Sequence, residues 1–464
     1  MSTFGMFEIG KSALIASKRT MDVTSHNIAN AATPGYSRQD AFLEPIIQRQ
    51  SYVSGVGVRV AQIRRQRDAF VDAVLRNELG RKALFFVQQE VLDHVQTAVA
   101  EPSGNSIRAA IDGFWSGWQD VANDPSSESA RAQLMERGRT LVDMFKHLGG
   151  QLDSVTQDID NNVEALIVRV NDLSERVAGL NVEIARALAR QEPASDLMDR
   201  RDLLIDELAE LTGATVTHLE QGSAVRVTIG GFPIVDRDKA FKIEASLTPT
   251  GAEFLWRSSP NNTPQTMSTV GGRLGGLKAA KENLVTDFKK QLENLFRDIV
   301  DRVNEQHRLG YTADDLTGID FFSVPASGDY LGGVEVNPAI VLDHRNIAAS
   351  GVAGDPENGH NALAIAEVLS ERSATGDPSF VEAWTAMIGT LGAKAQKVET
   401  SAATQELLVK EIENRKDSIS GVNVDEEVAS LIRQQHAFTA ASRVITIADE
   451  VIDTIINRMG HAGR

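Results

Sequence analysis

The stretch GVNVDEEVASLIRQQHAFTAASRVITIADEVIDTIINRM, residues 421–459, decides the fold predicted for this chain. Every seventh residue is apolar, in a row formed by Val424, Leu431, Phe438, Ile445, Ile452 and Met459, and a second row holds Ala441, Ala448 and Ile455. Apolar residues sustained at this spacing predict a helix with one seam turned toward a partner helix. Neither Gly nor Pro occurs between Val422 and Met459, so the helix can extend on the order of 50 Å.

A matching pattern opens the chain. One row at a seven-residue period is Phe7, Leu14, Met21 and Ile28, and a second row beside it is Ile9, Ala16 and Val23. Chain ends are usually weakly patterned, so strong heptad rows at both ends favour a chain that closes through its ends, on itself or on its neighbours. The alternative is two ordinary amphipathic helices, each packed on a globular core.

Composition narrows the class of protein. A chain of 464 residues is long enough for two to four domains, and a net charge of −17 argues against a nucleic-acid partner. The short basic group Arg64, Arg65 and Arg67 is interpreted as a solvated helix start. Cysteine is absent, which excludes disulfides and cysteine-ligated metals. The N-terminus lacks the pattern of a signal peptide, and no run of 18 apolar residues predicts a membrane span.

The middle of the chain alternates between helical and β-type sequence. Apolar residues at steps of three and four predict a coiled-coil helix over 152–188, with Gly149-Gly150 interrupting or kinking its beginning. Alternation predicts a short β-ribbon over 36–63 and several strands after residue 215. The predicted fold is therefore mainly α, elongated and multi-domain, with an inserted β-rich domain. We expect four parts: 1–60 with 421–464 as the terminal coiled coil; 61–195, 272–310 and 361–420 as a helical bundle; 196–271 as a β-rich outer domain; and 311–360 as a loop-rich link between outer and helical domains.

The sequence predicts no catalytic constellation. Residues 5–12, GMFEIGKS, fit the phosphate-loop pattern G-x-x-x-x-G-K-[ST], but that motif works only between a buried strand and a helix. Only four residues precede Gly5, and Phe7 and Ile9 belong to the apolar helical rows. Histidines such as His26, His307 and His436 are scattered in helical sequence, where partner-facing or solvated positions are expected. We therefore predict no enzyme, no cofactor and no metal site.

Motifs at both ends resemble the bacterial flagellar axial proteins of the rod, hook and hook–filament junction. The N-terminal motifs read NIAN at 27–30 and TPGY at 33–36. Further stretches resemble the junction members of that family: YSRQ at 36–39, GVGV at 55–58, DRRDLL at 199–204, GRLGGL at 272–277, NEQH at 304–307, SGVNVDEE at 420–427 and LIRQQ at 431–435.

The resemblance implies a structural subunit that joins hook to filament in a ring-like helical layer, with the terminal helices forming an inner tube. It adds Asn27, Asn30, Pro34, Gly35 and Tyr36 to the two apolar rows as the expected assembly interface. The implied partners are further copies of the chain, the hook protein, a second junction protein and through it the flagellin filament, and an export chaperone on the C-terminal helix. The implied location is the extracellular flagellum, reached without a cleaved signal peptide. A hook or distal rod subunit and a non-flagellar coiled-coil scaffold are the alternatives.

Overall fold

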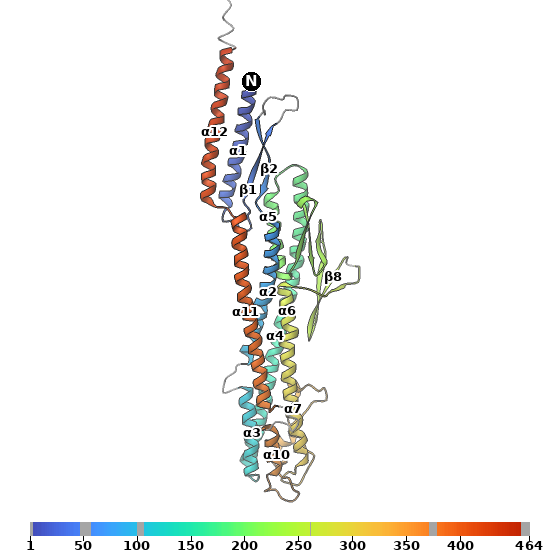
Figure 1. The fold of residues 1–464 in the computed structure, drawn as a ribbon. Coiled ribbons are helices and arrows are strands. Elements are labelled where there is room, and N and C mark those ends of the chain that lie inside the picture. Colours follow the sequence, from blue (N-terminus) through green and yellow to red (C-terminus); the bar gives the residue numbers. More distant parts are fainter. Residues whose placement is uncertain (1–2, 47–56, 100–105, 260, 371–377, 456–464) are drawn as a thin grey trace, which may run out of the picture.

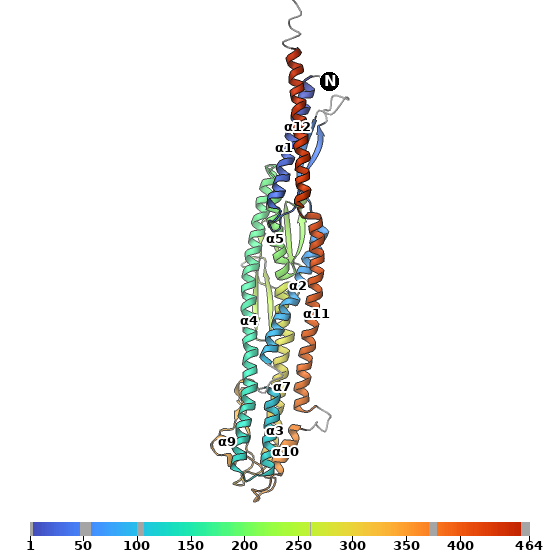
Figure 2. The same cartoon turned by 90° about the vertical axis from the view of Figure 1, so that its left-hand side faces the viewer.

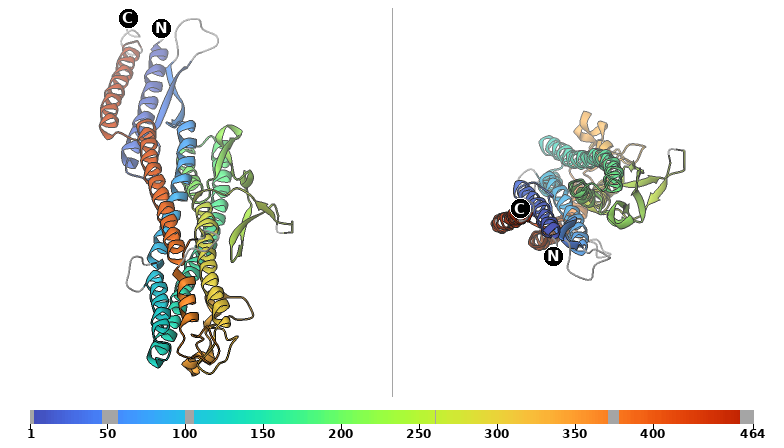
Figure 3. Two further views of the ribbon diagram at one scale, coloured as in Figure 1. Left: turned by 60° about the horizontal axis from the view of Figure 1, so that its bottom comes forward. Right: turned by 90° about the horizontal axis from the view of Figure 1, so that it is seen from above.

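The computed structural model describes residues 3–46, 57–99, 106–259, 261–370 and 378–455. It is a long rod built mainly from helices that run along its axis (Figure 1, Figure 2). Its first and last described helices lie at the same end of the rod and project beyond the rest (Figure 3). The predicted class, mainly α with a β-rich insertion, is confirmed.

The helical body forms the greater part of the rod. Its long elements are α2 (Ala69–Val99), α3 (Ile107–Asn123), α4 (Glu128–Ala189), α5 (Ser195–Thr212), α6 (Gly272–Ala280), α7 (Asp287–Leu309) and α11 (Phe380–Ser420). α11 and α6 pack on α2, while α3 and α5 pack on α4. Helix α4 buries Leu152, Val155, Ile159 and Val163 in one row, because steps of three and four residues return to the same helix face.

The expected interruption at Gly149-Gly150 was wrong. Helix α4 continues through both residues. Gly149 instead lies against the short helix α8 (Tyr330–Gly333), where a Cβ atom would come 3.3 Å from Leu331 Cβ. The glycine therefore permits close packing within the helix at a small cost in helix propensity.

A π-helical turn, η2 (Lys281–Thr286), joins α6 to α7. It begins at the fully buried Lys281, whose ammonium donates to Asp160 of α4 at 2.6 and 2.8 Å and to the Thr248 carbonyl at 2.6 Å. A buried ammonium needs such partners because desolvation of an unpaired charge is costly. Lys281 thereby ties the body to the β-rich region.

The β-rich region lies on one side of the body (Figure 1). One sheet has the order β3-β4-β5-β6 and the other β7-β8-β9, all antiparallel. Their bounds are β3 (Thr215–Leu219), β4 (Ala224–Ile229), β5 (Phe232–Asp236), β6 (Lys239–Ala240), β7 (Lys242–Thr248), β8 (Gly251–Arg257) and β9 (Gln265–Met267). A tight turn at Gly230-Gly231, both with positive φ, joins β4 to β5. The Trp256 indole N–H donates to the Pro233 carbonyl at 2.6 Å and links the two sheets.

Residues 311–370 close the distal end of the body, opposite the chain termini. Besides α8, the segment contains β10 (Phe322–Ser323), β11 (Glu335–Val336), α9 (Pro338–Leu342), the 3-10 turn η3 (His344–Asn346) and α10 (His360–Ser370). The rings of Phe321 and Phe322 are buried against Phe114 and Trp118 of α3. The segment therefore packs into the bundle, whereas we expected 311–360 to link the outer and helical domains. Helix α5 also packs on α2, α4 and α6. It thus belongs to the body, although we expected 196–271 to form the outer domain.

His307 also belongs to this distal core, and the expected partner-facing or solvated position was wrong. It is fully buried. The Ala348 backbone N–H donates to its Nε2 at 2.9 Å, so its Nδ1 carries the proton and donates to the Ile319 carbonyl at 2.7 Å. Burial lowers the pKa of His307 to about 4, since the charged form would lose its hydration.

The terminal elements complete the rod. Helix α1 (Thr3–Asn30) and helix α12 (Val424–Asp453) lie side by side (Figure 1). The predicted ribbon is present as β1 (Gln39–Ile46) paired antiparallel with β2 (Gly57–Arg65). Gly421 ends α11, and the Asn423 side chain caps α12 by accepting from the backbone N–H groups of Asp425 and Glu426.

Candidate assembly interface

Helices α1 and α12 approach closely because small residues line their contact. A Cβ atom on Gly10 would lie 2.8 Å from Ile445 Cγ1 of α12. On the α12 side, Ala441 and Ala448 are buried. The expected pairing of the two chain ends is therefore present within a single chain.

Both C-terminal rows contribute to this contact. Together they form the three-and-four alternation of a coiled-coil seam. Ala441 and Ala448 are buried, Leu431, Phe438, Ile445 and Ile452 are half-buried, and Val424 and Ile455 at the two ends are exposed. Met459 lies outside the described residues. The seam is thus only partly covered by α1.

On α1 the better-buried row is the second one. Ala16 and Val23 are buried, whereas Leu14, Met21 and Ile28 are half-buried and Phe7 is 37% exposed. The physical reason is that α1 has two neighbours. Ala16 lies one turn from Ser12, whose hydroxyl accepts from the Val58 N–H of β2 at 3.2 Å, so the Ala16 face is covered from the ribbon side.

Several large apolar side chains of the terminal helices face solvent in the single chain. Besides Phe7, Val424 and Ile455, the exposed members are Ile15 of α1 and Val428, Ile432, Ile447 and Val451 of α12. Isolated exposed apolar residues are ordinary. Here they accompany two half-buried heptad rows on the same pair of helices, which indicates surface that further helices can cover.

A polar joint connects this terminal pair to the ribbon and the body. Its central residue is Asn27, which is buried on α1. The Asn27 amide donates to the Gln39 carbonyl at 2.9 Å and accepts from the Gln39 N–H at 3.0 Å. It also donates to the Glu427 carboxylate of α12 at 3.1 Å, and the same carboxylate accepts from Arg38 Nε at 2.7 Å. One side chain therefore fixes α1, β1 and α12 together.

The turn after α1 supports the joint. Asn30 donates to the His26 carbonyl and accepts from the Thr33 hydroxyl, which closes the turn. Gly35 has a φ of +77°, a conformation that favours glycine, and a Cβ there would touch Leu203 at 3.4 Å. Pro34 is exposed at the apex. The Tyr36 hydroxyl donates to Asn27 Oδ1 at 2.8 Å, and burial together with the nearby Asp196 and Asp199 raises the pKa of Tyr36.

Buried ion pairs attach the ribbon to α5. Arg65 Nη1 lies 2.8 Å from both Asp199 and Asp202, and Arg67 Nη1 lies 2.8 Å from Asp202. Asp199 also accepts from the Ser37 backbone N–H and hydroxyl at 3.1 and 2.8 Å. Burial raises the pKa of Asp202, but Arg67, Arg65 and the α2 residue Arg76 outweigh it and hold that pKa below its usual value.

The interpretation of Arg64, Arg65 and Arg67 as a solvated helix start was wrong: Arg64 and Arg65 belong to strand β2, and only Arg64 is exposed. The side chains of Arg65 and Arg67 are only 15% and 10% exposed. Asp199 and Asp202, far along the chain, pair with them, and Asp72 of α2 also accepts from Arg67 at 2.9 Å. Glu427 of α12 is also buried. Its buried pairing with Arg38 spans 389 residues, and nothing local in the sequence announces such a partner.

No group of three or more His, Asp or Glu side chains is placed to hold a metal ion within the described ranges. The phosphate-loop match at 5–12 lies inside α1 from Gly5 onward, so its backbone N–H groups are directed along a helix. No helix of the described chain is long and apolar enough to cross a membrane.

Comparison with known families identifies the class. The family profile "Flagella basal body rod protein" matches residues 7–36, and "Flagellar basal body rod FlgEFG protein C-terminal" matches residues 417–459. These matches cover most of α1 and all of α12, with Asn27, Tyr36 and Glu427 of the joint, so the fold and the interface define a flagellar axial protein. The profile "Flagellar hook-associated protein FlgK helical domain" matches residues 92–322.

Relatives that match along their whole length indicate which flagellar axial family this chain resembles. The chain is 26% identical over 507 aligned positions to flagellar hook-associated protein 1 of Bacillus subtilis (strain 168), covering 100% of both chains. It is 23% identical to the protein of that name from Salmonella typhimurium (strain LT2), covering 96% of this chain and 98% of the relative. The solved structure of the flagellar hook junction protein FlgK from Burkholderia pseudomallei has the same fold, with a TM-score of 0.67 and 16% identity over 75% of this chain and 100% of the other. The chain belongs to the flagellar hook-associated protein 1 family.

Proposed function

We propose that this chain is a structural subunit of the bacterial flagellum that joins the hook to the filament. The single observation that carries the proposal is the terminal pair, in which α1 and α12 pack together and leave half-buried heptad rows at the surface. Relatives matched along their whole length are named hook-associated proteins. The family is structural, in keeping with the prediction from sequence.

Self-association uses the apolar heptad rows that remain partly exposed in a single chain. In this proposal Phe7, Leu14, Met21 and Ile28 of α1, with Leu431, Phe438, Ile445 and Ile452 of α12, contact the terminal helices of neighbouring copies. Apolar burial gives roughly 25 cal/mol per Å², so several half-exposed side chains per helix make repeated lateral contacts favourable. Asn27, Asn30, Pro34, Gly35 and Tyr36 hold the pair at a fixed position on the body.

The proposal also covers partners and location. The subunit binds the hook protein on one side and a second junction protein on the other, through which it reaches the flagellin filament. An export chaperone binds the C-terminal helix before assembly. The subunit works outside the cell and is exported without cleavage of a signal peptide.

Deletion of residues 421–464 tests the proposal. The deletion begins after Ser420, where α11 ends, and it removes α12. In cells whose native junction subunit is replaced by this chain, the full chain should keep filaments on hooks and the deleted chain should release them. The purified deleted chain should retain the far-ultraviolet circular dichroism expected for the body. Normal filaments on hooks with the deleted chain would contradict the proposal.

A further inference from the structure

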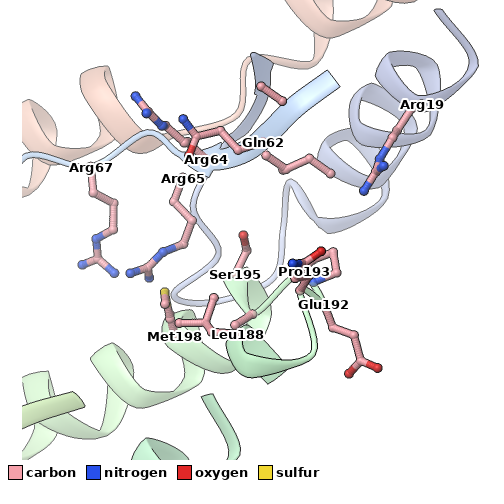
Figure 4. Close-up of a pocket in the computed structure, with 14 residues that line it drawn as sticks. Arg19, Gln62, Arg64, Arg65, Arg67, Leu188, Glu192, Pro193, Ser195 and Met198 are labelled. Carbon is pink, nitrogen blue, oxygen red and sulfur yellow. The ribbon is translucent and has the colours of Figure 1, made fainter. Parts of the chain in front are cut away.

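A basic groove lies where three parts of the chain meet. It is formed by α1, β2 and the loop between α4 and α5, and it encloses about 520 Å³ (Figure 4). Arg19, Arg64, Arg65 and Arg67 come from α1, β2 and the segment after it, while Leu188 and Glu192 belong to the opposite wall. Glu192 is the only carboxylate among the residues that line this groove.

Two of these arginines remain available to a partner. Arg65 and Arg67 are engaged by Asp199 and Asp202 at the base of the joint. Arg19 and Arg64 are exposed, and neither forms an ion pair with any described carboxylate. The Arg64 guanidinium instead lies over the Phe42 ring, 4.6 Å from its centroid, which holds its position without neutralising its charge.

A complementary acidic corner lies at the junction of α11 and α12. Asp417, Asp425 and Glu426 are exposed there, and their carboxylates have no ion-pair or hydrogen-bond partner in the described part of the chain. α12 lies on one side of α1 and the β1–β2 ribbon on the other (Figure 1, Figure 3). The acidic corner and the basic groove therefore occupy different sides of the unit that α1, α12 and the β1–β2 ribbon form.

Both surfaces lie next to the same joint. Glu427, which follows Glu426, binds Asn27 and Arg38, and Arg65, which follows Arg64, binds Asp199 and Asp202. Copies of the chain arranged side by side thus present groove and corner at similar positions along the rod. Since each chain carries a net charge of −17, neighbouring copies repel overall, and a local basic surface supplies attraction where they meet.

We propose that the basic groove of one copy receives the acidic corner of the neighbouring copy, as a head-to-tail contact repeated around the assembly. The inference rests on the proposed function, because it specifies a second interface of the same assembly. Contacts between two different surfaces of identical subunits generate rings or helical polymers. Paired charges of opposite sign also fix the register of such contacts and suppress wrong ones.

Cysteine cross-linking tests the contact directly. The chain has no cysteine of its own, so a disulfide can form only between introduced residues. Cells would co-express an Arg64→Cys chain and a Glu426→Cys chain, and isolated hook–filament junctions would be oxidised. We expect a cross-linked dimer, at least about five-fold more abundant than with Arg64→Cys and Glu450→Cys. Glu450 is exposed on the same helix, roughly 36 Å further along at 1.5 Å per residue.

Charge reversal provides the second measurement. Arg19→Glu with Arg64→Glu should reduce filament attachment at least about five-fold, as should Asp425→Lys with Glu426→Lys. The variant with all four changes restores the opposite charges across the contact and should recover attachment. A dimer yield equal to the control pair, or four changes no better than two, would overturn the inference. If the unaltered chain itself leaves hooks without filaments, the proposed function fails and the inference falls with it.

Discussion

The helical body and the terminal pair are both made of long helices, but they bury very different side chains. Helix α4 buries an apolar row along most of its length, including Leu141, Phe145 and Val170. Among the 30 residues of α12, the buried ones are Glu427, Ala441 and Ala448. The body therefore contains its own core, whereas the terminal pair is held by contacts between small residues and by the polar joint. We therefore expect the body to fold alone and the terminal helices to need neighbouring copies.

The largest effect should follow from a charge in the terminal seam. Phe438→Asp is expected to abolish filament attachment while leaving the urea midpoint of the body unchanged. The carboxylate would be buried without a partner in the assembly, which costs several kcal/mol, but it stays near solvent in the free chain. Ile445→Asp should behave alike. Thr439→Asp, on the exposed face of the same helix, is the matched control and should assemble normally.

A cavity in the body core should instead lower the free energy of unfolding of the body. Trp118 is fully buried among Phe114, Phe321 and His307. Trp118→Ala should lower the free energy of unfolding by about 4 kcal/mol, since the lost contacts leave a void. Phe70→Ala, at a side chain that is 71% exposed, should change it by less than about 0.5 kcal/mol. Equal urea midpoints for the two variants would contradict the distal core.

Removal of a buried carboxylate from the polar joint should destabilise the chain by an intermediate amount. Asp202→Asn removes the carboxylate that Arg65 and Arg67 share, so each buried arginine loses one of its carboxylate partners. Arg65 keeps Asp199 and Arg67 keeps Asp72, so we expect a loss of about 2 kcal/mol by urea unfolding, below the range for a buried charge left with no partner, together with faster proteolysis of the terminal ribbon. Asp196→Asn is the control, because its side chain is 58% exposed and exposed pairs contribute about 1 kcal/mol or less. A destabilisation by Asp196→Asn as large as that by Asp202→Asn would argue against the buried ion pairs.

Acid should weaken the distal end through His307. Its folded pKa of about 4 lies below the ordinary value of 6.5, so the unfolded chain takes up the proton first. Stability from this residue is complete above pH 6.5 and declines as the pH falls toward 4, by up to roughly 3 kcal/mol. Unfolding measured at pH 7 and pH 4.5 should show this loss, and His307→Gln should reduce it. An unchanged pH dependence in the variant would exclude His307 as its source.

The sequence predicted the long elements well because periodicity is a local signal. The 152–188 row, the ribbon over 36–63 and both terminal helices reappear in the structure. The choice between the two rows on α1 could not be predicted, since Leu14 and Ala16 are both apolar and only the position of the ribbon decides which is covered. The distal segment was misplaced because its Gly, Asp and Pro content resembles a linker, while the buried Phe321-Phe322 pair is a weak signal.

The joint could not be derived from local pattern either. Asn27 binds Glu427 across 400 residues, and Arg65 binds Asp199 across 134. A charged residue in a sequence does not indicate which opposite charge it will meet. Only the resemblance drew attention to residues 27–39, 199–204 and 420–427, and the structure brings those three stretches into one network.

Amide hydrogen exchange on the isolated monomer shows whether the terminal helices are incomplete without neighbouring copies. Most amides of α1 and α12 should exchange within seconds to minutes, while those of α4 and α7 remain protected for hours. After assembly the terminal amides should become protected as well. Strong protection of α1 and α12 in the monomer, equal to that of α4, would contradict the central claim.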